Sequence, residues 1–186
     1  GRTIGRAIRQ VSSTEENIRT KAEELFKAIN SPGCPQSLGI ELFADKILNG
    51  SRGSSNLFAL CRVIVLVTSK VPNAMDVFLA KLNGVCIYTV PKHIRYIKEE
   101  FESKDSYLRA IGFGEDDDGR METAEKYVER LHFYMGLYGA LVQTEVRGFR
   151  NLHGLREGWA WLARFLNHMP ANAFTLAALR SFLEVS

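Results

Sequence analysis

Apolar residues recur at intervals of three and four along most of this chain, and this spacing constrains the fold more than any other feature. The stretch with Ile18, Ala22 and Leu25 shows it first, because these residues fall on one face of a helix. Ser13 precedes that stretch and Glu16 follows three residues later, so we expect a capping box at its start. The pattern predicts helices that each bury one face against a neighbour.

Proline and glycine divide the remaining helical patterns into separate segments. We expect eight or nine helices and almost no strand, with Pro72 at the first position of one helix. The expected segments after the first are 36–48, 57–71, 72–82, 92–101, 121–145, 152–169 and 171–185. Helices of this length without a fixed repeat favour an all-α, HEAT-like α-solenoid of antiparallel helical pairs. We expect residues 1–186 to form one helical domain, with further helices following in a longer parent protein.

The segment 57–71 is apolar on nearly every side, and its β-branched residues would also suit a strand. No second segment offers a strand for it to pair with, and a lone strand is not stable. We therefore interpret this segment as a buried central helix.

Composition narrows the functional classes. Of the 186 residues, 46% are hydrophobic and 24% charged, which is ordinary for a folded domain, and the net charge is only +3. We therefore do not expect binding of duplex nucleic acid as the main function, and we expect no sequence-specific nucleic-acid binding. The longest apolar run is too short to span a membrane. Three scattered cysteines, Cys34, Cys61 and Cys86, indicate a reducing compartment.

Motifs of catalysis and metal binding are missing from the sequence. The four histidines have no partners at zinc-ligand spacing, and the acidic run before Gly119 lacks the alternation of a calcium loop. Neither a phosphate-binding glycine loop nor a nucleophile elbow occurs. We therefore predict a protein that is not an enzyme and has no catalytic or metal-binding residues.

Basic and aromatic residues gather in the predicted helix 92–101 and its flanks. They are Lys92, His93, Arg95, Lys98 and Lys104, interleaved with Tyr88 and Tyr96. One interpretation is a face for an anionic partner, either RNA or a phosphorylated ligand. The other is a solvated helix face, balanced by Glu99, Glu100 and Glu102.

Two tryptophans, Trp159 and Trp161, lie in one predicted helix. Two residues apart on a helix is about 200° of rotation, so the indoles cannot share a face. We expect one of them in the core and the other against a neighbouring helix or at an interface.

Two segments carry a resemblance to a known family. One is His153–Ser186, with its Trp159–Trp161 helix and the closing Phe-Leu-Glu-Val run, and the other is 86–112, which ends in Tyr107 followed by Ile111-Gly112. Both resemble the C-terminal domain of the nuclear-pore mRNA-export factors of the Gle-one family, in a plant-like form. The resemblance runs over nearly the whole chain and is weaker over 2–48. It implies that 1–186 is about the first two-thirds of that domain.

The resemblance implies a fold like the middle domain of translation-initiation scaffolds. It also implies a protein that binds and activates a DEAD-box mRNA-export helicase at the cytoplasmic face of the nuclear pore complex. Inositol hexakisphosphate tethers the two proteins in fungal members. Nuclear pore proteins and translation initiation and termination factors are further partners in the family, and nucleus and cytoplasm are its compartments.

The fungal polyphosphate pocket carries over to this chain only in part. Lys46 and Lys81 match basic positions of the family, whereas Gly50, Gly84 and Val85 stand where the family has basic residues. We therefore expect weaker or absent binding of inositol hexakisphosphate relative to fungal members. The candidates for compensation are Arg6, Arg9, Arg52 and Lys92.

Two other functions stay open at this point. A generic helical-repeat adaptor in translation or RNA processing would share the fold and not the helicase partner. An enzyme acting on an inositol phosphate or a nucleotide would need a nucleophile or metal constellation, and the sequence shows none.

Overall fold

The computed structural model describes residues 2–50, 56–115 and 118–185. In these ranges the chain forms nine α-helices and one short 3-10 helix, and its only β pairing is two isolated bridges. The helices are α1 (Arg2–Arg9), α2 (Glu15–Ile29), α3 (Gln36–Gly50), α4 (Leu57–Thr68), α5 (Ala74–Val85), η1 (Ile87–Thr89), α6 (Lys104–Ala110), α7 (Ala124–Gln143), α8 (Leu155–His168) and α9 (Ala173–Leu183). The all-α prediction is confirmed.

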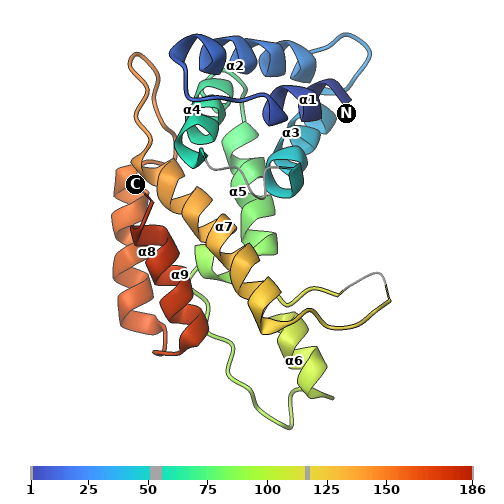
Figure 1. Cartoon of the computed structure of the whole chain (residues 1–186), viewed down its shortest axis with the longest axis vertical. Coiled ribbons are helices and arrows are strands. Elements are labelled where there is room, and N and C mark those ends of the chain that lie inside the picture. The colour runs from blue at the N-terminus through green and yellow to red at the C-terminus, as the bar shows by residue number, and fades with distance from the viewer. Residues whose placement is uncertain (1, 51–55, 116–117, 186) are drawn as a thin grey trace.

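The helices pack in two rows (Figure 1). In one row α1 contacts α3 and α3 contacts α5, and in the other α2, α4, α7 and α9 follow one another. Contacts of α1 with α2, α2 with α3 and α4 with α5 join the rows, and α8 packs on α7. Along each row one helix packs on the next, which is the layered arrangement of an α-solenoid and confirms that prediction.

Helix α4 is the buried central helix expected for the apolar run. From Ala59 to Thr68 only the Arg62 side chain reaches the surface, where it pairs with Glu15 of α2. Helix α4 lies between α2 and α7, which explains why it is apolar on almost every side. No helix of the described residues is long and apolar enough to cross a bilayer.

Two predicted helix starts are wrong by one or two residues. The N-cap of α2 is Thr14 rather than Ser13, because the Thr14 hydroxyl accepts the Asn17 N–H at 3.3 Å. Helix α5 begins at Ala74, and Asn73 precedes it in the left-handed region at φ 61°, so Pro72 lies outside the helix. The starts of α2 and α5 both depend on local backbone and capping geometry, which the apolar spacing does not define.

The predicted helix at 92–101 is wrong. These residues are not helical, and the basic residues along them are exposed. Tyr96 stacks on Phe101 at a centroid distance of 6.1 Å and meets Tyr107 of α6 edge-on at 5.2 Å. The aromatic side chains of this segment thus pack against each other and α6, and only Ile94 packs against the core, which is too little apolar contact to hold the segment as a helix. Helix α6, which the apolar spacing did not reveal, begins at a capping box of Ser103 and Ser106.

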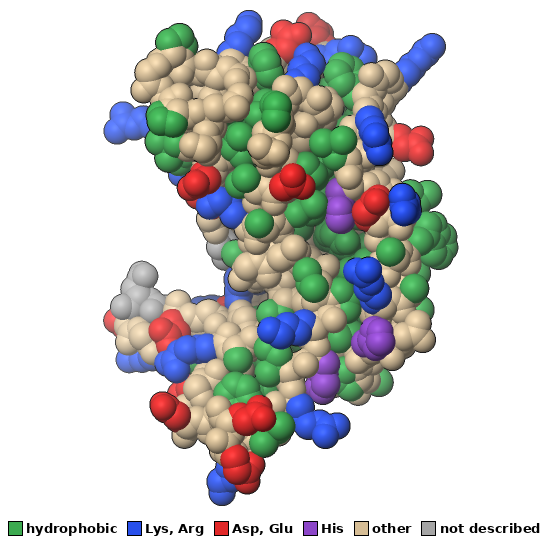
Figure 2. Space-filling model, turned by 180° about the vertical axis from the view of Figure 1, so that it is seen from behind, with side chains coloured by type: hydrophobic (Ala, Val, Ile, Leu, Met, Phe, Trp, Pro, Cys, Tyr) green, Lys and Arg blue, Asp and Glu red, His purple; other side chains and the backbone are tan. Residues whose placement is uncertain are grey.

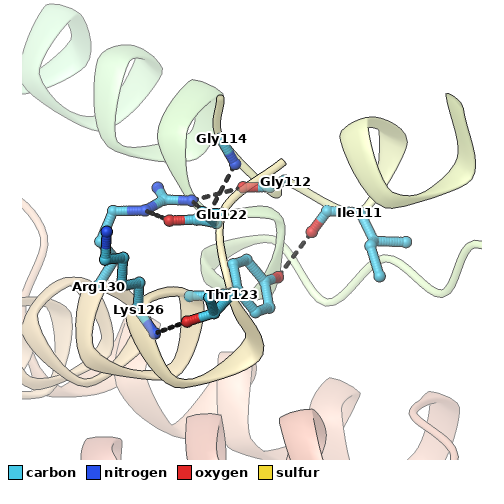
Figure 3. Close-up of polar contacts among 8 residues, drawn as sticks. Ile111, Gly112, Gly114, Glu122, Thr123, Lys126 and Arg130 are labelled. Atoms are coloured by element: carbon cyan, nitrogen blue, oxygen red, sulfur yellow. Dashed lines mark hydrogen bonds and ion pairs between the residues drawn. The ribbon is translucent and has the colours of Figure 1, made fainter. Parts of the chain in front are cut away.

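The connection from α6 to α7 is fixed by a partly buried ion pair (Figure 3). Arg130 of α7 pairs with Glu122 and donates to the Gly112 carbonyl at 2.8 Å, while Glu122 accepts the Gly114 N–H at 2.7 Å. The Tyr127 hydroxyl donates to the Ile111 carbonyl at 2.6 Å. These bonds explain the position of the segment that was predicted as an acidic surface loop, of which 116 and 117 lie outside the described residues.

Helix α9 lies directly against the backbone of α7. A Cβ atom on Gly139 would stand 2.5 Å from the Phe182 carbonyl oxygen, so only glycine permits this approach. Trp161 of α8 packs beside this contact, with its ring centroid 4.1 Å from that of Phe182. Its Nε1–H donates to the Tyr88 carbonyl at 2.8 Å. Trp161 is 3% exposed and Trp159 is 64% exposed, which confirms that the two indoles occupy different faces.

We predict that Gly139→Ala destabilises the fold, by about 1–3 kcal/mol, because the added methyl group must push α9 away from α7. The measurement is urea unfolding followed by circular dichroism. Gly84→Ala is the matched control: nothing lies within 4 Å of its added Cβ, so we expect equal or greater stability, by up to about 1 kcal/mol. Equal unfolding midpoints for the two variants would contradict the close contact.

Candidate functional site

Helix α1 presents three arginines on one exposed face. Arg2, Arg6 and Arg9 follow the spacing i, i+4, i+7, which places them on the same side of the helix. The opposite side buries Ile4 and Ile8 in the core where α1 meets α3. None of the three guanidinium groups forms an ion pair with an acidic residue in the described part of the chain, so their charges are available to a ligand.

Lys46 of α3 joins this basic face through the contact of the two helices. The Cβ position of Gly5 lies 3.5 Å from the Arg9 Nη1 atom and 3.5 Å from the Lys46 Cδ atom. The two cationic side chains therefore converge over Gly5. A Cβ atom at this position would be in ordinary van der Waals contact with both side chains.

Lys81 of α5 lies across the next helix contact of the same row. Its Nζ atom is 2.8 Å from the Asp45 Oδ1 atom of α3, and the two side chains are 29% and 46% exposed. Asp45 precedes Lys46 in the chain, so it brings Lys81 to the α3 surface and also offsets part of the local positive charge. A half-exposed pair of this kind is worth at most about 1 kcal/mol, and a polyanion that binds both lysines can displace it.

These three residues come from α1, α3 and α5, which follow one another in one row of helices (Figure 1), and we call Arg9, Lys46 and Lys81 the basic row. Arg6 belongs to the exposed face of α1 beside them. Multiple cations from adjacent helices are the arrangement that binds polyphosphates, since each phosphate oxygen accepts charge-assisted hydrogen bonds. The geometry suits binding of a polyanion and supplies no group for bond making or breaking.

The positions where the resemblance implies further basic residues differ in their surroundings in this chain. A Cβ atom on Gly50 or Gly84 would have nothing within 4 Å, whereas Val85 is half-buried and packs against the core. The two glycines thus remove charge without blocking access. Of the residues that could compensate for the missing basic positions, Arg9 lies beside Lys46, and Arg52 lies outside the described residues.

Lys92 does not extend the basic row. It lines a separate cavity of about 310 Å³ with His93 and Tyr107, near the start of α9. Tyr88, which was predicted to interleave with these cations, is buried in the core instead. The basic-aromatic face predicted from a helix at 92–101 is therefore not assembled, and exposed cations on an irregular segment remain.

The thiol and hydroxyl groups that could act as nucleophiles lie in surroundings that favour a structural role. Burial raises the pKa of the Cys86 thiol to about 11 and raises the pKa of Cys61 further, so both stay protonated. Ser181 of α9 contacts His132 of α7, and its hydroxyl donates to the Ala177 carbonyl of its own helix at 2.6 Å, so it is engaged in structural bonds. Across the described ranges, no three His, Cys, Asp or Glu side chains gather at metal-binding distance.

Sequence reasoning missed two features of this site. The arginine spacing in α1 was visible in the sequence, and it would have placed Arg2 and Arg6 with Arg9. The pairing of Asp45 with Lys81 joins residues of two different helices, and no local pattern signals it.

We predict that Asp45→Asn strengthens binding of inorganic tripolyphosphate about two- to fivefold, because it releases Lys81 from its ion pair. Isothermal titration calorimetry at low salt measures this. Glu41→Gln is the matched control, since it removes the same charge from the exposed surface of α3 without touching Lys81. Equal gains in the two variants would mean that net charge alone matters, and that Asp45 does not restrain Lys81.

Comparison with known proteins gives matches to a family model, to single proteins and to solved structures. The family model described as GLE1-like protein matches residues 1–186. The mRNA export factor GLE1 of Arabidopsis thaliana is 42% identical over 185 residues, which cover 98% of this chain and 26% of that protein. The factor of the same name from Rattus norvegicus is 34% identical over 118 residues, covering 61% and 16%. The chain thus spans about a quarter of the Arabidopsis relative.

Solved structures agree on the fold. All of this chain superimposes on 66% of a chain from the complex of the S. cerevisiae Dbp5 C-terminal domain bound to Gle1 and IP6, with a TM-score of 0.83. The sequence identity is 15%, so this likeness concerns the fold alone. A second such complex, with a variant Gle1, matches equally well.

Proposed function

Because the chain belongs to the GLE1-like protein family, we propose that it acts in mRNA export as a helical scaffold for a DEAD-box RNA helicase. The relatives are named as export factors rather than enzymes, which supports a role in binding. The solved complex pairs a protein of this fold with Dbp5 and IP6, which supports a helicase partner. The observation that carries the proposal is the basic row, where Arg9 and Lys46 converge beside Gly5 and Lys81 pairs with Asp45, the residue next to Lys46.

The ligand of the basic row is inositol hexakisphosphate, placed between this chain and the helicase. A molecule with six phosphates needs more cations than one small surface supplies, so it is best satisfied by two proteins at once. Between them it also offsets the mutual repulsion of two basic surfaces. Lys46 and Lys81 are the proposed contacts on this chain, and Arg9 adds a third cation beside Lys46.

Binding of the polyphosphate by this chain alone is weak in this proposal. Gly50 and Gly84 leave two positions without charge, and Asp45 competes for Lys81. The helicase therefore contributes much of the binding site. The polyphosphate and the helicase then bind cooperatively, because each completes the site of the other.

Activation of the helicase and release of RNA are the proposed outcome of this contact. In this proposal the chain acts as the relatives named as export factors suggest, by favouring one arrangement of the helicase over another. The proposed location is the cytoplasmic face of the nuclear pore complex, with nuclear pore proteins as further partners. Translation initiation and termination factors are proposed as secondary partners, in the nucleus or cytoplasm.

We predict that inositol hexakisphosphate tightens binding of this chain to the cognate DEAD-box export helicase at least about tenfold. Isothermal titration calorimetry measures the affinity with and without the polyphosphate. In Arg9→Glu/Lys46→Glu the polyphosphate should no longer strengthen binding, because two contacts become repulsive.

The matched control is Lys27→Glu/Arg150→Glu. It reverses two exposed charges on α2 and on the turn before α8, and should keep the full effect. An equal loss in both double variants would reduce the effect to net charge and contradict the basic row. No binding by any folded form of the chain would contradict the helicase scaffold itself.

A further inference from the structure

A pocket of about 430 Å³ lies along α8, and none of the residues of the basic row lines it. Helix α8 is at the left in Figure 1 and at the right-hand edge in Figure 2, where blue and purple side chains gather. The opposite wall comes from the end of α5 and from residues 89–91. Its ligand is not the polyphosphate of the proposed function, because the lining is different in kind.

The floor of this pocket is apolar. Leu79, Val90, Pro91 and Trp161 line it, and Trp161 is held in place by its bond to the Tyr88 carbonyl. Val90 is half-exposed and has an extended backbone, with φ −112° and ψ 105°. A floor of this composition suits one aliphatic side chain of a ligand.

Two arginines stand on the rim. Arg156 and Arg164 are exposed and form no ion pair with the acidic residues that the structure describes. They are eight residues apart on α8, which corresponds to about 12 Å along the helix axis. Unpaired guanidinium groups at this separation match two carboxylates on one ligand.

The other polar groups of the pocket are already engaged. The Glu157 carboxylate accepts the Gly154 N–H at 3.0 Å, and Tyr138 and His153 are hydrogen bonded to each other at 3.1 Å. Burial lowers the pKa of His153, so its ring is neutral at pH 7. Glu157 stands between the two arginines in the chain, and its charge disfavours a ligand with closely spaced phosphates. A ligand with two separate anions avoids it.

We infer that this pocket binds an extended acidic peptide segment of a partner protein, with the pattern acidic-x-aliphatic-x-acidic. In an extended chain, residues i, i+2 and i+4 point to one side, and i and i+4 are about 13 Å apart. The two carboxylates therefore reach Arg156 and Arg164 while the aliphatic side chain between them enters the floor beside Trp161.

The experiment uses the fluorescence of Trp161 as a reporter. The chain contains two tryptophans, so Trp159→Phe leaves Trp161 as the only one, and Trp159 is exposed on another face. The probe is the capped peptide Gly-Glu-Ser-Leu-Ser-Glu-Gly. We expect a saturable change in Trp161 emission, and at least about tenfold weaker binding when both glutamates are replaced by glutamine.

Charge reversal on the protein provides the matched comparison. Arg156→Glu/Arg164→Glu should lose binding at least about tenfold and gain binding to the same peptide with lysines in place of the glutamates. Lys27→Glu/Arg150→Glu carries the same change of net charge outside the pocket and should bind the original peptide normally. Circular dichroism confirms that each variant is folded.

Several results would overturn the inference. They are absence of binding by the folded Trp159→Phe protein, equal binding of the glutamate and glutamine peptides, and loss of binding in the control variant as well. Saturation of the Trp161 signal by single-stranded RNA, without a response to the peptide, would assign the pocket to nucleic acid instead. Helicase binding is not used as a readout, so failure here leaves the proposed function untouched.

Discussion

The structure depends on the close packing of α9 against α7. Gly139 permits it, because any side chain there would collide with the Phe182 carbonyl. Helix α7 in turn contacts α4, α8 and η1, and η1 contacts α5, so the packing of α9 on α7 is connected to both rows. Trp161 occupies the space between α8 and Phe182 and bonds back to Tyr88. Packing of this density fixes each helix relative to the next, which a binding scaffold requires.

The basic row is a consequence of the solenoid arrangement. Because α1 packs on α3 and α3 on α5, Arg9, Lys46 and Lys81 come from neighbouring helices although they are far apart in the chain. Arg9 and Lys46 converge over Gly5, and Asp45, the residue next to Lys46, restrains Lys81. Rigid helices thus hold the charges before any ligand arrives, so a polyanion meets a surface that is already formed.

Most helices that bury an apolar face could be predicted from sequence, but α1, which buries Ile4 and Ile8, could not. The buried helix α4 follows from its apolar run with no strand to pair with, and the opposite orientations of Trp159 and Trp161 follow from their spacing. The segment 92–101 is not helical, because Tyr96 and Phe101 pack with Tyr107 of α6. Lys46 and Lys81 were chosen from family resemblance and remain predictions as ligand contacts. Their neighbours Arg9 and Asp45 depend on contacts between helices, which no local pattern encodes.

The most direct test of the basic row is an NMR titration of the isotope-labelled chain with inositol hexakisphosphate. We predict that the side-chain signals of Arg9, Lys46 and Lys81 shift together, at one common affinity, with the backbone of α1 following them. Those three side chains would then form a single site. Shifts confined to the exposed cations of 92–98 or to α8, with Lys46 and Lys81 unchanged, would contradict the assignment.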